Sequence, residues 1–176
     1  MNIRVVVAYA TKYGATAEIA AKIGQVLEQA GFRTDVLPTD RIGAPTPYKA
    51  VVLGSAVYMG HWLGEAMEFA RRNHAILADR LVWLFSSGPL ELGPGISSAN
   101  DPELEPKEIA ELQEAIHPRD HRIFFGALDP SKLGLKHRVI RALPAARAIL
   151  PEGDFRDWDA IASWAAGIAD GLKEAA

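Results

Sequence analysis

Residues 5–20 read VVVAYATKYGATAEIA, and this stretch decides the fold of the chain. Its apolar first half predicts a buried strand, and the residues that follow predict a tight turn and then a helix. A helix N-terminus leaves backbone N–H groups unpaired and carries partial positive charge. Thr11 and Thr16 add hydroxyl donors, and Gly14 lets the backbone approach a ligand closely. The stretch therefore predicts a phosphate site that needs no basic side chain.

The turn lacks the two commonest nucleotide-binding motifs. No G-x-G-x-x-G follows the strand, which argues against a dinucleotide fingerprint. No G-x-x-x-x-G-K-[ST] follows it either, which argues against a P-loop. Taken alone, a strand, a glycine turn and a helix can also be the ordinary start of an α/β protein.

The composition narrows the classes of function. The chain has 176 residues, 49% of them hydrophobic and 23% charged, which suits one domain, residues 1–176, with a sizeable core. Its net charge of −3 gives no support to nucleic-acid binding. The lack of cysteine excludes thiolate nucleophiles and cysteine-ligated metals, so redox chemistry must come from a bound cofactor. A strand pattern begins directly after the first residues and leaves no room for a signal peptide, so we expect a cytoplasmic protein.

Strand and helix patterns alternate along the chain. The predicted strands are 3–9, 32–37, 50–54, 81–85 and 122–128. The predicted helices are 16–30, 63–77, 107–116 and 158–172, and an irregular, basic segment is expected at 129–154. Five strands with intervening helices indicate a parallel sheet covered on both faces. Two doubly wound orders are common, and one of them, 2-1-3-4-5, places a ligand at the carboxyl ends of strands 1 and 3.

Two further loops follow predicted strands at the same edge of this sheet. After the third strand comes GSAVYMGHW, residues 54–62, which is aromatic and has a glycine in its second half. A flat aromatic ligand needs apolar walls and a backbone that can hydrogen-bond its ring nitrogens. After the fourth strand comes SSGPL, residues 86–90, which can offer backbone donors. Tyr58 and Trp62 can equally be packing residues at the entry to a helix.

These motifs carry a family resemblance that spans most of the chain. The turn TKYGAT at 11–16 resembles the T/S-x-T-G-x-T phosphate loop of flavodoxins, with Tyr13 where many flavodoxins have Thr. With the loops after the third and fourth strands and the late run FGAL at 125–128, it resembles the branch of the flavodoxin-domain family that includes menaquinone-dependent protoporphyrinogen oxidase. The resemblance implies a flavodoxin-like α/β fold, with a doubly wound, five-stranded parallel sheet in the order 2-1-3-4-5 and helices on both faces, and a bound FMN.

The resemblance also implies which residues surround FMN. The phosphate would be held by Thr11, Lys12, Tyr13, Gly14, Ala15 and Thr16. The isoalloxazine ring would be flanked by Ala56, Val57, Tyr58, Met59, Gly60, Ser87, Gly88, Pro89 and Leu90. Met59 departs from the aromatic residue often found before the glycine, so stacking would fall to Tyr58. A backbone carbonyl near this glycine accepts a hydrogen bond from reduced N5 in flavodoxins, and Gly60 is the expected position because a peptide flip there needs a residue without a Cβ.

The resemblance implies redox function of one of three kinds. We expect an FMN-dependent oxidoreductase that takes hydrogen from protoporphyrinogen or a similar hydrophobic donor and passes electrons to a quinone. The alternatives are a flavodoxin-type carrier with protein redox partners and a relative that has lost flavin. No acidic residue stands between Gly54 and Gly64, whereas Lys12 and His61 are close in sequence. We therefore expect the reduced flavin to be less disfavoured than in acidic electron-carrier flavodoxins, which favours the enzyme. The residues leave the oligomeric state open.

Several titratable side chains are candidates for chemistry or for a metal site. His61 is a candidate proton donor to flavin or substrate, or else a surface histidine at a helix start. No metal site is expected, because His117, His121 and His137 lack the spacing of metal ligands. Five glutamates are interpreted as a solvated acidic face: Glu103, Glu105, Glu108, Glu111 and Glu114.

The segment 131–149 is basic and carries apolar residues at helical spacing. Its cations are Lys132, Lys136, Arg138, Arg141 and Arg147, with no acid among them. The apolar stripe would consist of Leu133, Val139, Ile140, Leu143, Ala146 and the adjoining Leu150. Such a segment can lie on an anionic membrane surface, which would bring the flavin to a lipid-soluble quinone at the inner face of the membrane. A surface helix packed on the domain and a cover over the substrate entrance are the alternatives.

Overall fold

The computed structural model describes residues 3–88, 102–135, 139, 142–143 and 152–175. Its central sheet has five parallel strands in the order β2-β1-β3-β5-β6. These strands are β1 (Arg4–Ala10), β2 (Arg33–Pro38), β3 (Ala50–Tyr58), β5 (Leu81–Ser87) and β6 (His121–Phe124). Counting the parallel strands alone gives the predicted order 2-1-3-4-5, so the predicted flavodoxin-like fold is confirmed. A short strand, β4 (His61–Trp62), pairs antiparallel with the end of β3.

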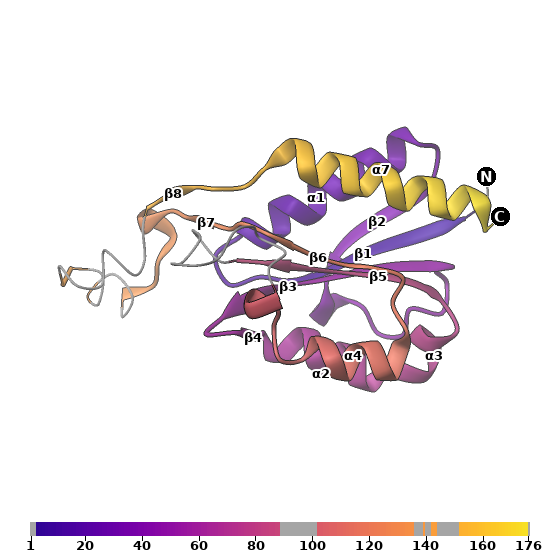
Figure 1. Cartoon of the computed structure of the whole chain (residues 1–176), viewed down its shortest axis with the longest axis horizontal. Coiled ribbons are helices and arrows are strands. Elements are labelled where there is room, and N and C mark those ends of the chain that lie inside the picture. The colour runs from indigo at the N-terminus through magenta and orange to yellow at the C-terminus, as the bar shows by residue number, and fades with distance from the viewer. Residues whose placement is uncertain (1–2, 89–101, 136–138, 140–141, 144–151, 176) are drawn as a thin grey trace.

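Helices cover both faces of this sheet (Figure 1). One face carries α1 (Ala15–Gln29) and α7 (Trp158–Glu174). The other carries α2 (Gly64–Arg72), α3 (His74–Ala78) and α4 (Ile109–Ile116). Short 3₁₀ turns are η1 (Thr39–Arg41), η2 (Pro102–Leu104) and η3 (Pro130–Lys132).

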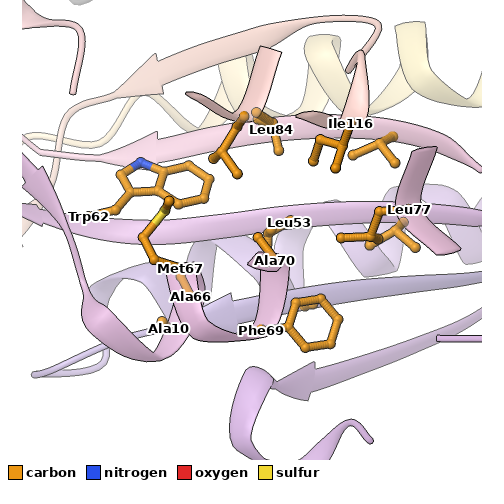
Figure 2. Close-up of a cluster of buried hydrophobic side chains, with 14 of the residues drawn as sticks. Ala10, Leu53, Trp62, Ala66, Met67, Phe69, Ala70, Leu77, Leu84 and Ile116 are labelled. Carbon is orange, nitrogen blue, oxygen red and sulfur yellow. The ribbon is translucent and has the colours of Figure 1, made fainter. Parts of the chain in front are cut away.

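Two apolar cores fill the space between the sheet and its helices, because successive residues of a strand face opposite sides. Val6 and Ala8 of β1 pack toward α2 and α4 in a cluster that includes Trp62, which lies at one end of it (Figure 2). Val5 and Val7 pack in the other cluster, with residues of α1 and α7. Burial on both faces explains why these strands read as continuous apolar runs.

Asn73 interrupts the helix that the sequence predicts at 63–77. Its buried side-chain amide donates to the backbone carbonyl of Phe69 at 3.0 Å and to that of Gly43 at 3.3 Å. An amide that bonds to nearby carbonyls competes with the helical backbone ladder. The prediction of one continuous helix is therefore wrong, and α2 and α3 are separate.

The strand predicted at 122–128 is wrong in its second half. β6 ends at Phe124, which pairs with Ser87, the last residue of β5. Because β5 ends at Ser87, residues after Phe124 have no neighbouring strand to pair with, and the chain leaves the sheet. Ala127–Leu128 instead forms β7, which pairs antiparallel with β8 (Gly153–Asp154).

The basic segment 131–149 is described in part. Leu133 is buried, whereas Leu135, Val139 and Leu143 are exposed. The other residues of the predicted apolar stripe lie outside the described residues: Ile140, Ala146 and Leu150. The stripe stays a prediction, as does the assignment of residues 1–176 to one domain. Within the described ranges, no helix has the length and apolar character that crossing a membrane requires.

Candidate functional site

The loops that follow β1, β3 and β5 leave the sheet at one edge. The register pairs Ala10 with Ser55 and Ala56 with Ser87, so β1 and β5 end almost level while β3 continues to Tyr58. Parallel strands that end together present their loops to a common crevice, and this edge includes the switch point of the strand order. Two predicted ring-flanking residues, Pro89 and Leu90, lie outside the described residues.

The turn at residues 11–16, here called the phosphate turn, is closed by local hydrogen bonds. The Gly14 N–H donates to Thr11 Oγ1 at 3.0 Å, and the Glu18 N–H donates to the Gly14 carbonyl at 3.1 Å as α1 begins. Gly14 has a φ of +97° and provides no side-chain cap for the helix. The first-turn N–H groups are therefore left for a ligand, and the Thr11 hydroxyl keeps its own hydrogen to donate. This donor set fits a phosphate dianion.

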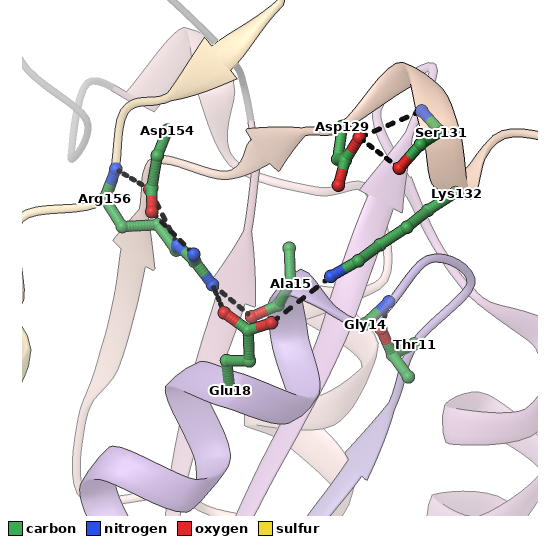
Figure 3. Close-up of polar contacts among 9 residues, drawn as sticks. All are labelled: Thr11, Gly14, Ala15, Glu18, Asp129, Ser131, Lys132, Asp154 and Arg156. Atoms are coloured by element: carbon green, nitrogen blue, oxygen red, sulfur yellow. Dashed lines mark hydrogen bonds and ion pairs between the residues drawn. The ribbon is translucent and has the colours of Figure 1, made fainter.

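Charged side chains fasten a distant part of the chain beside this turn (Figure 3). Arg156, whose side chain is 7% exposed, donates to Asp154 at 2.6 and 2.8 Å and to Glu18 Oε2 at 2.7 Å. Lys132 Nζ lies 3.6 Å from Glu18 Oε1. The hydrogen bonds from Arg156 hold the pKa of Asp154 below its ordinary value, although burial acts against them. Two cations and two carboxylates balance, so the phosphate turn gains no net charge from this group.

The end of β3 and β4 form a hairpin, residues 57–62. Val57 pairs with Trp62 and Tyr58 with His61, which leaves Met59 and Gly60 as a two-residue turn. Both turn residues have positive φ, 52° for Met59 and 78° for Gly60, as a type I′ turn requires. Glycine adopts this conformation freely, whereas Met59 is held there with its side chain 97% exposed. The Gly60 carbonyl accepts a hydrogen bond from the Lys107 N–H at 3.2 Å, so the carbonyl expected to serve flavin N5 already has a partner.

Aromatic side chains join this hairpin to the phosphate turn. The rings of Tyr13 and Tyr58 meet edge to face, with centroids 6.5 Å apart. Lys12 Nζ lies 5.2 Å from the Tyr58 ring centroid and 5.8 Å from that of Tyr13. Burial, and secondarily Tyr13, raise the pKa of Tyr58 to about 12, so its phenol stays neutral. The two loops that the sequence places at one edge are thus in contact.

Glu108 holds the second strand of the hairpin. One carboxylate oxygen lies 2.7 Å from His61 Nδ1, and the other accepts the Trp62 backbone N–H at 3.1 Å. Burial disfavours the charged form, but the hydrogen bonds from His61 and Trp62 outweigh it and hold the pKa of Glu108 below its ordinary value. His61 is therefore half-exposed and hydrogen-bonded to Glu108, an arrangement that the sequence did not indicate.

The interpretation of the glutamates as a solvated face is confirmed for the exposed Glu105 and Glu111 but is wrong for Glu108, whose side chain is only 16% exposed. All three have partners that the sequence did not indicate. Glu108 pairs with His61, Glu105 lies 3.5 Å from the buried His121, and Glu111 binds the Arg71 guanidinium through both oxygens. The patterns on which the interpretation rested are local, and these partners come from other elements. Among the described residues, no group of three or more histidine, aspartate and glutamate side chains could hold a metal ion.

The start of the third loop is tightly packed. Ser86 and Ser87 are buried, and the Gly88 N–H donates to the Phe124 carbonyl at 2.9 Å. Gly88 has a φ of +122°, and a Cβ there would lie 3.4 Å from the Val57 carbonyl oxygen. Ser86 Oγ accepts the Trp62 indole N–H at 2.8 Å, which ties this loop to the hairpin.

Solved structures resemble this fold. A flavodoxin from the domain Archaea is 16% identical with a TM-score of 0.59, covering 97% of this chain and 99% of that one. A mutant flavodoxin from Pseudomonas aeruginosa is 15% identical with a TM-score of 0.60, covering 97% and 99%. A flavodiiron core from Synechocystis is 14% identical with a TM-score of 0.65, and this chain spans 37% of that longer chain. At these identities the likeness shows the fold alone.

Sequence comparison identifies the family. No curated protein matches the chain. A model of the flavodoxin domain matches residues 6–146, which is more than half of the chain. The narrower resemblance to menaquinone-dependent protoporphyrinogen oxidase stays a prediction. The chain therefore belongs to the flavodoxin domain family, which implies FMN as its cofactor.

Proposed function

We propose that the chain is an electron-transfer flavoprotein whose FMN lies across the ends of β1, β3 and β5. One observation carries the proposal: a helix start without a side-chain cap lies beside an aromatic hairpin, and Tyr13 of the first contacts Tyr58 of the second. Bound FMN supplies the redox chemistry by taking up and releasing electrons. The chain's own residues bind the cofactor, orient it and tune its midpoint potential.

The phosphate turn is the proposed anchor for the phosphate group. The N–H groups that follow Gly14 donate to phosphate oxygens, and the hydroxyls of Thr11 and Thr16 add donors from the side. The partial positive charge of the α1 N-terminus favours the dianion. Glu18 does not repel it strongly, because Arg156 and Lys132 already neutralise that carboxylate.

The hairpin and the third loop are the proposed walls of the ring site. Tyr58, Met59 and Gly60 would lie on one side of the isoalloxazine, and Ser87 and Gly88 on the other. Tyr58 is neutral and adds no negative charge, whereas the nearby Lys12 ammonium adds a positive one. Positive charge stabilises a reduced, more negative ring and raises its midpoint potential. Glu108 works against this, although His61 pairs with it.

A second candidate is an oxidoreductase acting on a hydrophobic donor such as protoporphyrinogen, with a quinone as acceptor. Its support is the exposed apolar surface: Met59 at the hairpin tip, and Leu135, Val139 and Leu143 in the basic segment. Apolar side chains among cations suit a peripheral contact with anionic lipid, where quinones dissolve. The first candidate instead exchanges electrons with a redox protein.

Titration of the purified chain with FMN tests the shared part of both candidates. We expect one noncovalently bound FMN per chain, followed by the absorption of the bound flavin, and no comparable uptake of FAD. Folded protein that takes up no FMN would overturn the proposal.

Reoxidation of the reduced holoprotein without air separates the candidates. Faster reoxidation by menaquinone in anionic liposomes than by a redox protein favours the oxidoreductase. In that case changing Lys136, Arg138 and Arg141 to Gln should weaken liposome binding and leave FMN affinity unchanged. Protein that ignores anionic liposomes at low salt favours the carrier, because electrostatic attraction is strongest there.

A further inference from the structure

A line of hydrogen bonds runs from the hairpin through the sheet to Glu105. The Trp62 indole N–H donates to Ser86 Oγ at 2.8 Å, and Ser86 Oγ lies 2.8 Å from His121 Nε2. On the other side of the ring, His121 Nδ1 lies 3.5 Å from Glu105 Oε1. Ser86 is fully buried and the His121 side chain is only 7% exposed, so water does not readily replace these partners.

The chemistry of the groups fixes the direction of this line. An indole N–H can only donate, so the Ser86 oxygen accepts from Trp62 and its own hydrogen goes to His121 Nε2. A carboxylate can only accept, so Nδ1 carries the ring proton and faces Glu105. Every member of the line is satisfied while His121 is neutral.

Protonation of His121 breaks this arrangement at one atom. A proton taken from solvent onto Nε2 turns that nitrogen from an acceptor into a donor. The Ser86 hydroxyl hydrogen then points at another donor and must rotate away inside a buried site. The Ser86 oxygen can still accept from both His121 and the Trp62 indole, but rotation of its hydroxyl in a buried site turns the lone pairs and so weakens the hydrogen bond from Trp62.

The charged groups around His121 are few. Burial lowers the pKa of His121, and the carboxylates of Glu105 and Asp120 act in the opposite direction without overcoming it. Asp120 is shared with other donors, since it accepts from the Trp164 indole at 2.7 Å and from Arg122 Nε at 3.3 Å. The neighbours on the side of β5 and β4, Ser86 and Trp62, are uncharged. His121 is therefore neutral at neutral pH, and its buried position shifts protonation to a more acid pH than for a free histidine.

Trp62 connects this line to the candidate flavin site. Its backbone pairs with Val57, and the adjoining pair, Tyr58 with His61, borders the turn at Met59. Glu108 fixes the Trp62 backbone, whereas Ser86 fixes its indole ring. A weaker hydrogen bond to the indole loosens the side-chain anchor of the strand that carries the turn.

We propose that His121 is a positioning residue for the flavin site: neutral His121 holds Trp62 through Ser86 and so keeps the hairpin in its ligand-binding shape, and its protonation weakens FMN binding. The inference rests on the proposed function in one respect, namely that FMN is the ligand of the hairpin.

The FMN dissociation constant, measured between about pH 8 and pH 5, tests the proposal in the holoprotein. FMN binding to the unchanged chain should weaken toward acid pH. His121→Gln cannot titrate at this position, so at pH 5 we expect it to bind FMN about fivefold more tightly than the unchanged chain does. The FMN phosphate titrates in the same range but affects every variant alike. His74→Gln removes an exposed histidine of α3 and should keep the full pH dependence. Equal pH profiles for His121→Gln and the unchanged chain would overturn the proposal.

The flavin-free chain gives a readout that does not depend on FMN. The indole N–H resonance of Trp62, identified by its loss in Trp62→Phe, should shift with pH in step with the His121 ring. Ser86→Ala should uncouple the two titrations while His121 still titrates. An indole resonance that ignores His121 in the unchanged chain overturns the proposal even if a variant fails to fold. Coupled titrations in a chain that binds no FMN would instead overturn the proposed function.

Discussion

The phosphate turn and the hairpin meet at one edge of the sheet, but different contacts hold them. The turn is closed by the Gly14 N–H and the Thr11 hydroxyl, which are three residues apart. The hairpin depends on Glu108, 47 residues from His61, and on Ser86, 24 residues from Trp62. The turn is therefore encoded where it stands, whereas the shape of the hairpin depends on the packing of α4, β5 and β6 around it.

Gly14→Val should have the largest effect, and it disrupts the locally encoded phosphate turn. A β-branched residue is strained at a φ of +97°, and relieving the strain turns the first N–H groups away from the phosphate. We expect FMN affinity to fall about 100-fold, the loss of roughly two hydrogen bonds to a charged group.

Gly31→Val is the matched control for this change. Gly31 follows the other end of α1 with a φ of +95° and the same open space around a Cβ. It should lose similar stability yet keep FMN, as equilibrium titration will show. Equal losses of FMN affinity in both variants would mean that Gly14 acts through stability alone.

Arg156→Ala probes the long-range support beside the turn. The guanidinium is nearly buried and bonds to Asp154 and Glu18, so we expect the free energy of unfolding to fall by about 2 kcal/mol. FMN affinity should also fall, though less than for Gly14→Val, because the variant leaves one cation, Lys132, against the carboxylates of Glu18 and Asp154 beside the phosphate turn. Denaturant unfolding measures the first effect, and exposed Arg33→Ala is the control.

Arg156→Ala should also change how the free energy of unfolding depends on pH in the acid range. The pKa of Asp154 is lowered in the folded chain, so its contribution is present above the unfolded pKa of about 3.9 and is lost as pH falls below that value. Arg156→Ala should flatten this acid limb. An unaltered slope would show that Asp154 draws its low pKa from another group.

Glu108→Ala breaks the distant half of the comparison. The change removes the partners of the His61 ring and the Trp62 backbone N–H and leaves the phosphate turn untouched. We expect about a tenfold loss of FMN affinity, smaller than for Gly14→Val because the hairpin keeps its pairing with β3. Glu111→Ala removes a paired glutamate of the same region and should retain affinity within about twofold, since its ion pair is exposed.

Met59→Asn should have the smallest effect of these substitutions, and it tests the conformation of the hairpin turn. Asn tolerates positive φ, and Asn-Gly is the favoured pair for a type I′ turn, so stability should rise by about 0.5–1 kcal/mol. Met59→Leu keeps the strain and should give no gain in thermal unfolding. A loss of stability in the Asn variant would mean that the Met59 side chain makes a packing contribution despite its exposure.

The sequence was sufficient wherever a feature is encoded locally. The alternating patterns predicted the parallel sheet, the family resemblance predicted its strand order, and the motif at 11–16 predicted a turn that the structure closes through Thr11 and Gly14. It was insufficient where a side chain reaches far along the chain. The interruption at Asn73 depends on Gly43, and Arg156 meets Glu18 across 138 residues. No spacing rule marks such partners.

The hairpin tip also has a chemical consequence. Met59 and Met67 form a natural pair within the described chain, one 97% and the other 4% exposed. A thioether open to solvent gains an oxygen atom far more readily than one enclosed in a core, and the resulting sulfoxide is polar and chiral. Storage in air should therefore convert the apolar Met59 side chain at the hairpin tip into a hydrophilic one, while the buried Met67 remains intact. The age of a preparation would then be readable as a single added oxygen on one peptide.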